Sequence, residues 1–434
     1  MYRICMVSDF FYPNSGGVES HIFQLSQCLL NFGHKVVVLT HAYGDRKGVR
    51  YMSNGLKVYY APFLVIYNQC TMPTLFCSLP LVRNILIREQ IDIVHSHSAF
   101  STMAIESLIH GKMLNLKTVF TDHSLFGFAD VSAIITNQLL RMSLIFANAV
   151  ICVSHVGKEN TALRAGVVPE KIFVIPNAVD ADTFKPDSDR IKKTNHHHNH
   201  ITIIVVSRLV YRKGIDLLVE AIPKICDTYE DVKFLIVGDG PKRVNIEQMV
   251  ETHGLQNRVT LMGMVKHEYI RDILVQGDIF VNSSLTEAFC MAIIEAASCG
   301  LQVVSTNVGG IPEVFPDDLI ILTEPNRESL TEGISLAIRK FRNKSAPNPI
   351  ESHKWVREHY RWKNIAQRTL KVYDRVFQDV DEPITSSLNR LWKLGSVCDI
   401  LMLFVIVIEL LSFRLWSYLM PKEKIDKASE LASH

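Results

Sequence analysis

Short apolar runs with strand character alternate along most of this chain with segments of helical character. Such runs occur at residues 3–8, 35–40, 92–95, 118–121, 149–153, 172–175, 201–208, 233–238, 259–263, 278–281 and 301–305. Apolar runs separated by helices are typical of a parallel sheet covered by helices on both faces. The alternation therefore predicts an α/β protein with two doubly wound domains, one on each side of a break near residue 200.

Composition narrows the class of protein and the compartment. The chain has 434 residues, 48% of them hydrophobic and 21% charged, with a net charge of +2, so no nucleic-acid partner is expected. Its nine cysteines are scattered and form no C-x-x-C pair, which favours reduced thiols. The N-terminus shows no signal-peptide pattern, and we therefore expect the α/β domains to be cytoplasmic.

The domain organisation follows from these runs and from shifts in composition. We expect an N-terminal domain over 1–185, an insert over 186–200, a second domain over 201–348, helices over 349–382 that pack back towards the first domain, a juxtamembrane segment over 383–399, a transmembrane helix over 400–419 and a tail over 420–434. The insert carries His196, His197, His198 and His200. A histidine tract can bind metal, but its low complexity favours a flexible surface insertion.

Loops at the ends of the first strands carry candidate binding residues. Gly16 and Gly17 lie between the run at 3–8 and a helix over about 18–32, where free backbone N–H groups can approach a phosphate. They do not match G-x-G-x-x-G, and a glycine pair is also a plain tight turn. Polar residues, among them His97 and His123, follow later strands, where they would collect at a ligand crevice, although a single histidine there is more often structural.

The second domain has a similar set of loops. Arg208 and Lys213 follow its first strand, where two cations could neutralise a diphosphate or could be ordinary surface charges. The stretch 283–300 predicts a polar loop and then a helix, with Thr286 as N-cap and Gly300 at the C-terminus. Glu287 lies in this loop and Glu295 about two turns into the helix; alone, both could be solvated charges.

The block at 400–419 is rich in Leu, Ile, Val and Phe. On a translocon scale its side chains favour insertion modestly, even after the cost of Glu409 near the centre and Arg414 nearer the end. The alternative is a buried or interfacial helix of the globular part. Basic residues flank the block on both sides, so their distribution does not predict its orientation.

Taken together, Gly16–Gly17, Arg208, Lys213 and the pair Glu287 and Glu295, with seven residues between them, resemble the retaining glycosyltransferases that use nucleotide sugars and have two Rossmann-like domains. The resemblance covers about residues 1–380 and implies the GT-B arrangement, in which the two domains face each other across a cleft. The runs at 8–13, 120–130, 207–214 and 285–291 resemble the members of this group that begin glycosylphosphatidylinositol-anchor synthesis.

This closer resemblance implies the reaction and its setting. The donor would be UDP-N-acetylglucosamine, the acceptor phosphatidylinositol in a membrane, and the configuration of the sugar would be retained. The chain would act on the cytoplasmic face of the endoplasmic reticulum, together with other subunits of a complex, and the tail after residue 419 would be luminal. No cofactor is implied, and because no aspartate-metal motif is present, no metal is expected.

The resemblance also implies roles for single residues. Arg208 and Lys213 would hold the diphosphate and stabilise charge as UDP leaves. Gly16 and Gly17 would donate backbone hydrogen bonds to the same phosphates. His123 would lie beside the sugar.

The remaining donor-binding residues lie in the stretch 283–300. Glu295 would bind the ribose hydroxyls, and Glu287 would orient the sugar and stabilise charge rather than act as a nucleophile. Phe289 and Cys290 would contact the donor at the helix start. The wider family usually has glycine where this chain has Cys290, which we expect to be a packing substitution and not a reactive thiol.

Three other functions remain open from the sequence. A nucleotide-sugar-binding subunit without its own chemistry would be expected to lack a member of the motif, whereas every member is present here. A phosphorylase of the same fold would need a lysine in a pyridoxal-binding context, which we do not find. A soluble transferase acting on polysaccharide would not need the block at 400–419.

Overall fold

The computed structural model describes residues 1–14, 16–73, 75–125, 131–187, 200–380 and 382–428. The chain forms two compact units, Met1–Ile175 with Ile365–His434 (unit 1) and Pro176–Asn364 (unit 2). The domain boundary predicted at residue 185 lies within unit 2. His196, His197 and His198 of the predicted insert lie outside the described residues.

Unit 1 is built on an eight-stranded sheet in the order β10-β9-β8-β7-β1-β2-β4-β3. Its strands are β1 (Arg3–Val7), β2 (Lys35–His41), β3 (Gly48–Tyr51), β4 (Lys57–Ala61), β7 (Ile93–His97), β8 (Lys117–Asp122), β9 (Ala149–Cys152) and β10 (Ile172–Val174). All neighbours are parallel except β3, which is antiparallel to β4. The predicted parallel sheet is confirmed, whereas β3 and β4 were not predicted.

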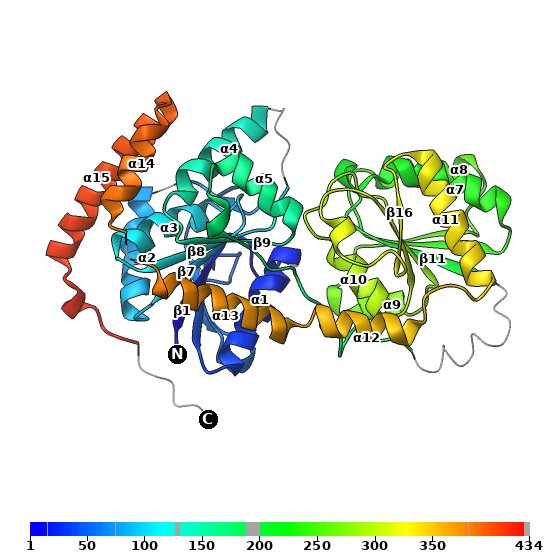
Figure 1. Ribbon diagram of the computed structural model, residues 1–434, viewed down its shortest axis with the longest axis horizontal. Coiled ribbons are helices and arrows are strands. Elements are labelled where there is room, and N and C mark those ends of the chain that lie inside the picture. The colour runs from blue at the N-terminus through cyan, green and yellow to red at the C-terminus, as the bar shows by residue number, and fades with distance from the viewer. Residues whose placement is uncertain (15, 74, 126–130, 188–199, 381, 429–434) are drawn as a thin grey trace. The chain divides into compact units, whose positions relative to one another are not determined.

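Helices cover both faces of this sheet (Figure 1). They are α1 (Gly17–Asn31), α2 (Leu75–Arg88), α3 (Thr102–Met113), α4 (Val131–Leu144), α5 (His155–Ala165), α13 (Trp362–Gln378), α14 (Ile384–Leu394) and α15 (Val397–Leu419); β5 (Val65–Tyr67) and β6 (Cys70–Thr71) form a separate pair. Phe120 of β8 is fully buried and packs in one cluster with Leu108 of α3 and Leu391 of α14. The C-terminal helices are thus part of the hydrophobic core of unit 1.

The C-terminal apolar block requires a correction. Among the described residues no helix has both the length and the apolar character needed to cross a bilayer, so the transmembrane helix predicted at 400–419 is not supported. Instead, α15 packs beside α14 and against α2 (Figure 1). Ile406 and Glu409 are fully buried, and Glu409 Oε1 lies 2.6 Å from His110 Nε2 of α3. The carboxylate that interrupts the block is therefore a packing contact with the globular unit, as in the alternative above.

Unit 2 has six parallel strands in the order β13-β12-β11-β14-β15-β16. They are β11 (Ile201–Val206), β12 (Val232–Val237), β13 (Val259–Gly263), β14 (Ile279–Asn282), β15 (Gln302–Thr306) and β16 (Ile320–Thr323). The helices are α7 (Ile215–Thr228), α8 (Arg243–Thr252), α9 (Ile270–Leu274), α10 (Met291–Ser298), α11 (Arg327–Arg342) and α12 (Pro349–His359). This sheet confirms the second predicted α/β domain.

Candidate active site

Two loops at the carboxyl edge of the unit 2 sheet are fixed to each other. The loop after β11 contains the short helix η3 (Tyr211–Lys213) and ends at Gly214, and the loop after β14 begins at Ser283. Ser283 Oγ donates to the Lys213 carbonyl at 2.8 Å, and the Leu285 N–H donates to the Arg212 carbonyl at 2.9 Å. Gly214 has φ +63°, and a Cβ there would lie 1.8 Å from the Ser283 carbonyl oxygen. Glycine therefore permits the close approach that positions Lys213.

Lys213 and Glu287 meet where these loops join. The Lys213 ammonium donates to Glu287 Oε1, and Ser284 Oγ donates to the same oxygen at 3.0 Å. The Gly310 N–H fixes the Glu287 carbonyl at 3.0 Å. Burial lowers the pKa of Lys213, but the Glu287 carboxylate outweighs this effect, and the pKa is raised above its usual value. Lys213 is therefore a cation at neutral pH.

Arg208 lies on the same side of the sheet, and its side chain is exposed. Its charge is near enough to Lys213 to oppose the rise in the lysine pKa. The structure thus brings together Arg208, Lys213 and Glu287, as the sequence predicted, in a site with two cations and one carboxylate. Such a pair of cations suits a diphosphate.

Glu295 lies on α10 and its side chain is buried. Its Oε1 is 2.8 Å from His267 Nε2, in the short helix that precedes α9. The hydrogen bond to Glu295 raises the pKa of His267, against the smaller opposing effect of burial. His267 was not singled out from the sequence, because nothing in the order of the strands pairs its loop with α10. It holds the carboxylate predicted to bind ribose.

The start of α10 differs from the prediction. Thr286 is not the N-cap; Cys290 occupies that position without a side-chain hydrogen bond, and the helix begins at Met291. Phe289 and Cys290 are both buried, which leaves their backbone rather than their side chains available to a donor. Burial raises the pKa of the Cys290 thiol to about 12. The thiol is therefore protonated at neutral pH, in agreement with the expected packing role, and Gly300 at φ +91° ends the helix as predicted.

In unit 1, Gly16 and Gly17 begin α1 after the loop that follows β1. Gly16 is the N-cap with an extended backbone, and Gly17 is the first helical residue. The first N–H groups of a helix have no partner within it, so this end can accept an anion. A Cβ at Gly16 would lie 2.5 Å from Glu19 Oε2, so the carboxylate of the first turn is close to the glycine pair.

His123 belongs to a cluster of histidines at the carboxyl edge of the unit 1 sheet. His97 ends β7, and its pairing with Thr121 of β8 places it next to His123. His97 Nδ1 and His123 Nε2 are 3.3 Å apart, and the rings of His21 and His123 meet edge to face at 4.7 Å. Burial and the neighbouring histidines keep the pKa values of His97 and His123 well below the usual value. These two rings are neutral at physiological pH.

His21 was not recognised from the sequence. It lies on α1 next to the apolar stripe of Ile22, Leu25 and Leu29, which is buried against the sheet. The helical spacing of that stripe is a signal that could have placed His21 on the inner face. Its proximity to His97 and His123 depends on how α1 packs on the strands, which the spacing does not specify.

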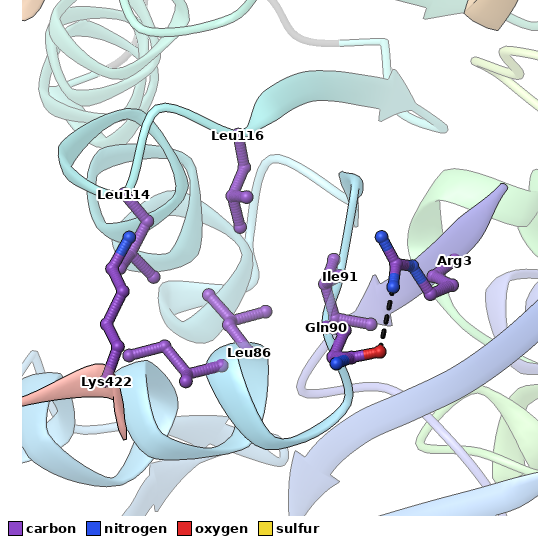
Figure 2. A pocket seen from close by; sticks show the side chains of 8 residues that line it. Arg3, Leu86, Gln90, Ile91, Leu114, Leu116 and Lys422 are labelled. Atoms are coloured by element: carbon purple, nitrogen blue, oxygen red, sulfur yellow. Dashed lines mark hydrogen bonds between the residues drawn. The ribbon is translucent and has the colours of Figure 1, made fainter. Parts of the chain in front are cut away.

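A separate pocket of about 270 Å³ lies at the opposite, amino edge of the unit 1 strands. It is lined by Arg3, Leu86, Ile87, Gln90, Ile91, Leu114, Leu116 and Lys422, and Arg3 donates to Gln90 Oε1 at 2.9 Å (Figure 2). None of the predicted site residues lines this pocket. Its wall is mostly aliphatic, and Arg3, Gln90 and Lys422 are its polar lining residues.

Comparison with known proteins agrees with this geometry. Residues 41–130 match the family described as PIGA (GPI anchor biosynthesis), and residues 187–351 match glycosyl transferases group 1. The homologous phosphatidylinositol N-acetylglucosaminyltransferase chain of Homo sapiens is 55% identical over 428 residues, which cover 98% of this chain and 87% of the human protein. The chain belongs to the PIGA family of phosphatidylinositol N-acetylglucosaminyltransferase subunits. The Arabidopsis thaliana member is 51% identical, and the alignment covers 99% of this chain and 94% of the Arabidopsis protein.

Solved structures support the GT-B-like fold of this family member. Sucrose-phosphate synthase from Thermosynechococcus elongatus aligns with a TM-score of 0.70 at 22% identity, over 87% of this chain and all of the other. Anabaena HepE, solved in complex with UDP and glucose, aligns with a TM-score of 0.68 at 20% identity, over 86% of this chain and 100% of the other. The predicted α/β glycosyltransferase fold is confirmed, and Arg208, Lys213, Glu287 and Glu295 all lie in the region that matches glycosyl transferases group 1.

Proposed function

We propose that this chain transfers N-acetylglucosamine from UDP-N-acetylglucosamine to phosphatidylinositol, with retention of configuration. The reaction is the first step of glycosylphosphatidylinositol-anchor biosynthesis. The observation that carries the proposal is the half-buried contact between Lys213 and Glu287, with the exposed Arg208 beside it, in a member of the PIGA family.

Departure of UDP is the step that these cations assist. Negative charge grows on the diphosphate as the bond to the sugar breaks, and fixed cations stabilise that charge without having to reorganise. Arg208 is exposed and can fold onto the phosphates, whereas Lys213 is held in place by Glu287. We infer that the two cations do this without a divalent ion.

Two carboxylates orient the rest of the donor. Glu287 accepts from Lys213 and Ser284 through Oε1, which leaves Oε2 for a sugar hydroxyl. Glu295 accepts from His267 through Oε1, and in this proposal the ribose hydroxyls take over that carboxylate from His267. Phe289 and Cys290 contribute backbone groups at the start of α10, whose unpaired N–H groups favour an anionic or hydroxylic partner.

Unit 1 contributes two further groups in this proposal. The N–H groups at Gly16 and Gly17 donate to the phosphates from the start of α1. His123 is half-buried and neutral, so one ring nitrogen can donate to, or accept from, a sugar hydroxyl. The chain would act on the cytoplasmic face of the endoplasmic reticulum membrane, with the other subunits of a transferase complex, on phosphatidylinositol of that membrane.

The test is a transfer assay in microsomes or in the reconstituted complex, with phosphatidylinositol and a panel of nucleotide sugars. Lys213→Ala and Glu287→Gln should lower kcat by at least about 100-fold, the size expected when one group that stabilises transition-state charge is lost. Arg342→Ala is the control: Arg342 pairs with Asp231 at 2.6 Å on the same unit, just before β12 begins and thus at the opposite edge of the sheet, and its loss should change the rate less than twofold.

Three results would contradict the proposal. Full transfer by both site variants would exclude the assigned residues. Loss of activity on removal of divalent ions with a chelator would exclude a metal-free departure of UDP. Binding of UDP-N-acetylglucosamine without transfer by the wild-type chain in its complex would instead favour a nucleotide-sugar-binding subunit.

A further inference from the structure

We propose that His21, His97 and His123 form a binding site for a divalent cation of the zinc class in unit 1. Each histidine offers one ring nitrogen, and the three ligand atoms all lie within 4.8 Å of one another. This site goes beyond the proposed transfer reaction, which we infer to proceed without a divalent ion.

The spacing of two of the ligands is already that of a metal site. Zinc binds imidazole nitrogen at about 2.0–2.1 Å in a tetrahedral arrangement, which places two such nitrogens about 3.3 Å apart. His97 Nδ1 and His123 Nε2 are 3.3 Å apart. No separation in the cluster is greater than 4.8 Å, so none exceeds the tetrahedral value by more than about 1.5 Å, a distance that a side-chain rotation can cover.

Two of these ligands lie on regular elements, and the third directly follows a strand. His97 ends β7, His123 follows β8 directly, and His21 lies on α1. The His95 ring lies against that of His97, with the ring centres 4.2 Å apart. His95 is itself fixed, because its Nδ1 bonds to the Tyr373 hydroxyl and its Nε2 to Thr121 Oγ1, both at 2.7 Å. His95 is therefore not a ligand, but it orients the ring of the ligand His97.

The donor set decides which cation suits the site. Three imidazoles with no carboxylate among them favour zinc and its neighbours over magnesium or calcium, which prefer oxygen ligands. His21 and His97 are buried while His123 is only half-buried, so a fourth ligand, such as water, would enter on the His123 side.

One consequence reaches the active site. His123 is also the residue proposed to contact the sugar, so a bound cation should inhibit transfer by occupying its ring nitrogen. This consequence, unlike binding of the cation, rests on the proposed function. Binding is therefore measured directly, and a transfer assay with added zinc is read separately.

The experiment uses the full-length chain with His196, His197, His198 and His200 replaced by asparagine, because that tract can bind zinc by itself. Zinc is titrated in competition with a chromophoric chelator, and cobalt(II) is added in parallel to record the visible bands of a four-coordinate site. We expect one equivalent to bind with micromolar or tighter affinity. His97→Gln and His21→Gln should each weaken binding at least tenfold and remove the cobalt bands.

His253→Gln is the matched control, because His253 is an exposed histidine of unit 2 and its loss should leave the affinity unchanged. A zinc-dependent rise in Tm for the parent chain, absent from the His21→Gln variant, checks the result, and the Tm of that variant without zinc shows that the buried substitution still folds. No saturable binding below 100 µM zinc, or equal affinity in the parent and both cluster variants, overturns the proposal.

Discussion

At the scale of single residues, Glu295 must serve two partners. Its buried carboxylate accepts from His267 at 2.8 Å, and the same group is proposed to bind the ribose of the donor. The ring of Phe184 lies 5.4 Å from that of His267 on another side and carries no charge. The protonation state of His267 should therefore decide how strongly Glu295 is held away from the nucleotide.

The affinity for UDP should rise with pH through the range just above pH 6.5. Protonated His267 is stabilised by Glu295, which raises its pKa above the usual value of about 6.5, so a ligand that takes over Glu295 must displace that interaction at low pH. His267→Asn should flatten this dependence. Equilibrium binding of UDP to the parent chain and to the variant, between about pH 5.5 and 8.5, measures the two pH dependences. A dependence of the affinity on pH that persists in the variant would exclude His267 as its source.

Gly214 should tolerate alanine much less well than another glycine of the same backbone conformation. Gly214 and Gly254 both have φ +63°, but a Cβ at Gly214 would lie 1.8 Å from the Ser283 carbonyl, whereas nothing lies within 4 Å at Gly254. Gly254→Ala should cost only the left-handed conformation, about 1–2 kcal/mol. Gly214→Ala should cost more and should also displace Lys213; equal losses in the free energy of unfolding would refute the close approach.

At the scale of secondary-structure elements, α15 has two unlike faces. One face packs on unit 1 through Ile406 and Glu409, both fully buried. The other exposes Phe404, Ile408 and Leu411. The apolar composition of the block thus comes from both faces, and composition alone does not show that one of them is covered by the protein.

Glu409→Ala should loosen α15 from α3. Glu409 and His110 are both fully buried and bonded to each other, so truncating one leaves the other without its partner, at a cost of about 3 kcal/mol. The double variant His110→Leu/Glu409→Leu should recover most of that loss, because two apolar side chains can replace a buried pair. Hydrogen exchange of the α15 amides measures the loosening.

Leu411→Ala serves as the control on the exposed face of α15 and should change protection by less than about 0.5 kcal/mol. Equal protection in Glu409→Ala and Leu411→Ala would mean that the buried pair does not hold the helix.

At the scale of the whole molecule, the chain leaves unit 1 at Ile175 and returns to it at Ile365, within α13. The returning segment supplies core side chains such as Leu391 and Ile406, and the Tyr373 hydroxyl that fixes His95. Unit 1 is therefore completed by residues almost two hundred positions after its first part ends. Truncating the chain after unit 2 would remove part of the unit 1 core.

Much of the fold could be predicted because it depends on local pattern. Apolar runs of strand length with polar residues at their ends predicted the parallel sheets, and a strand end at the ligand edge predicted Arg208, Lys213 and His123. Arg208 and His123 lie just after the ends of β11 and β8, and Lys213 lies in the loop that follows β11. β3, β4 and β16 were missed; for β3, the reason is that Gly48–Tyr51 is exposed and lacks the apolar run of a buried strand.

The sequence by itself determined the α/β class, the pair of sheets and, by resemblance, the family, because periodicity and motif order are properties of the chain. Only the tertiary structure decided which polar groups meet. It paired Glu295 with His267, gathered His21 with His97 and His123, and turned Glu409 towards His110. Each of these contacts joins elements distant in sequence, and its geometry depends on helix packing, which short-range pattern does not encode.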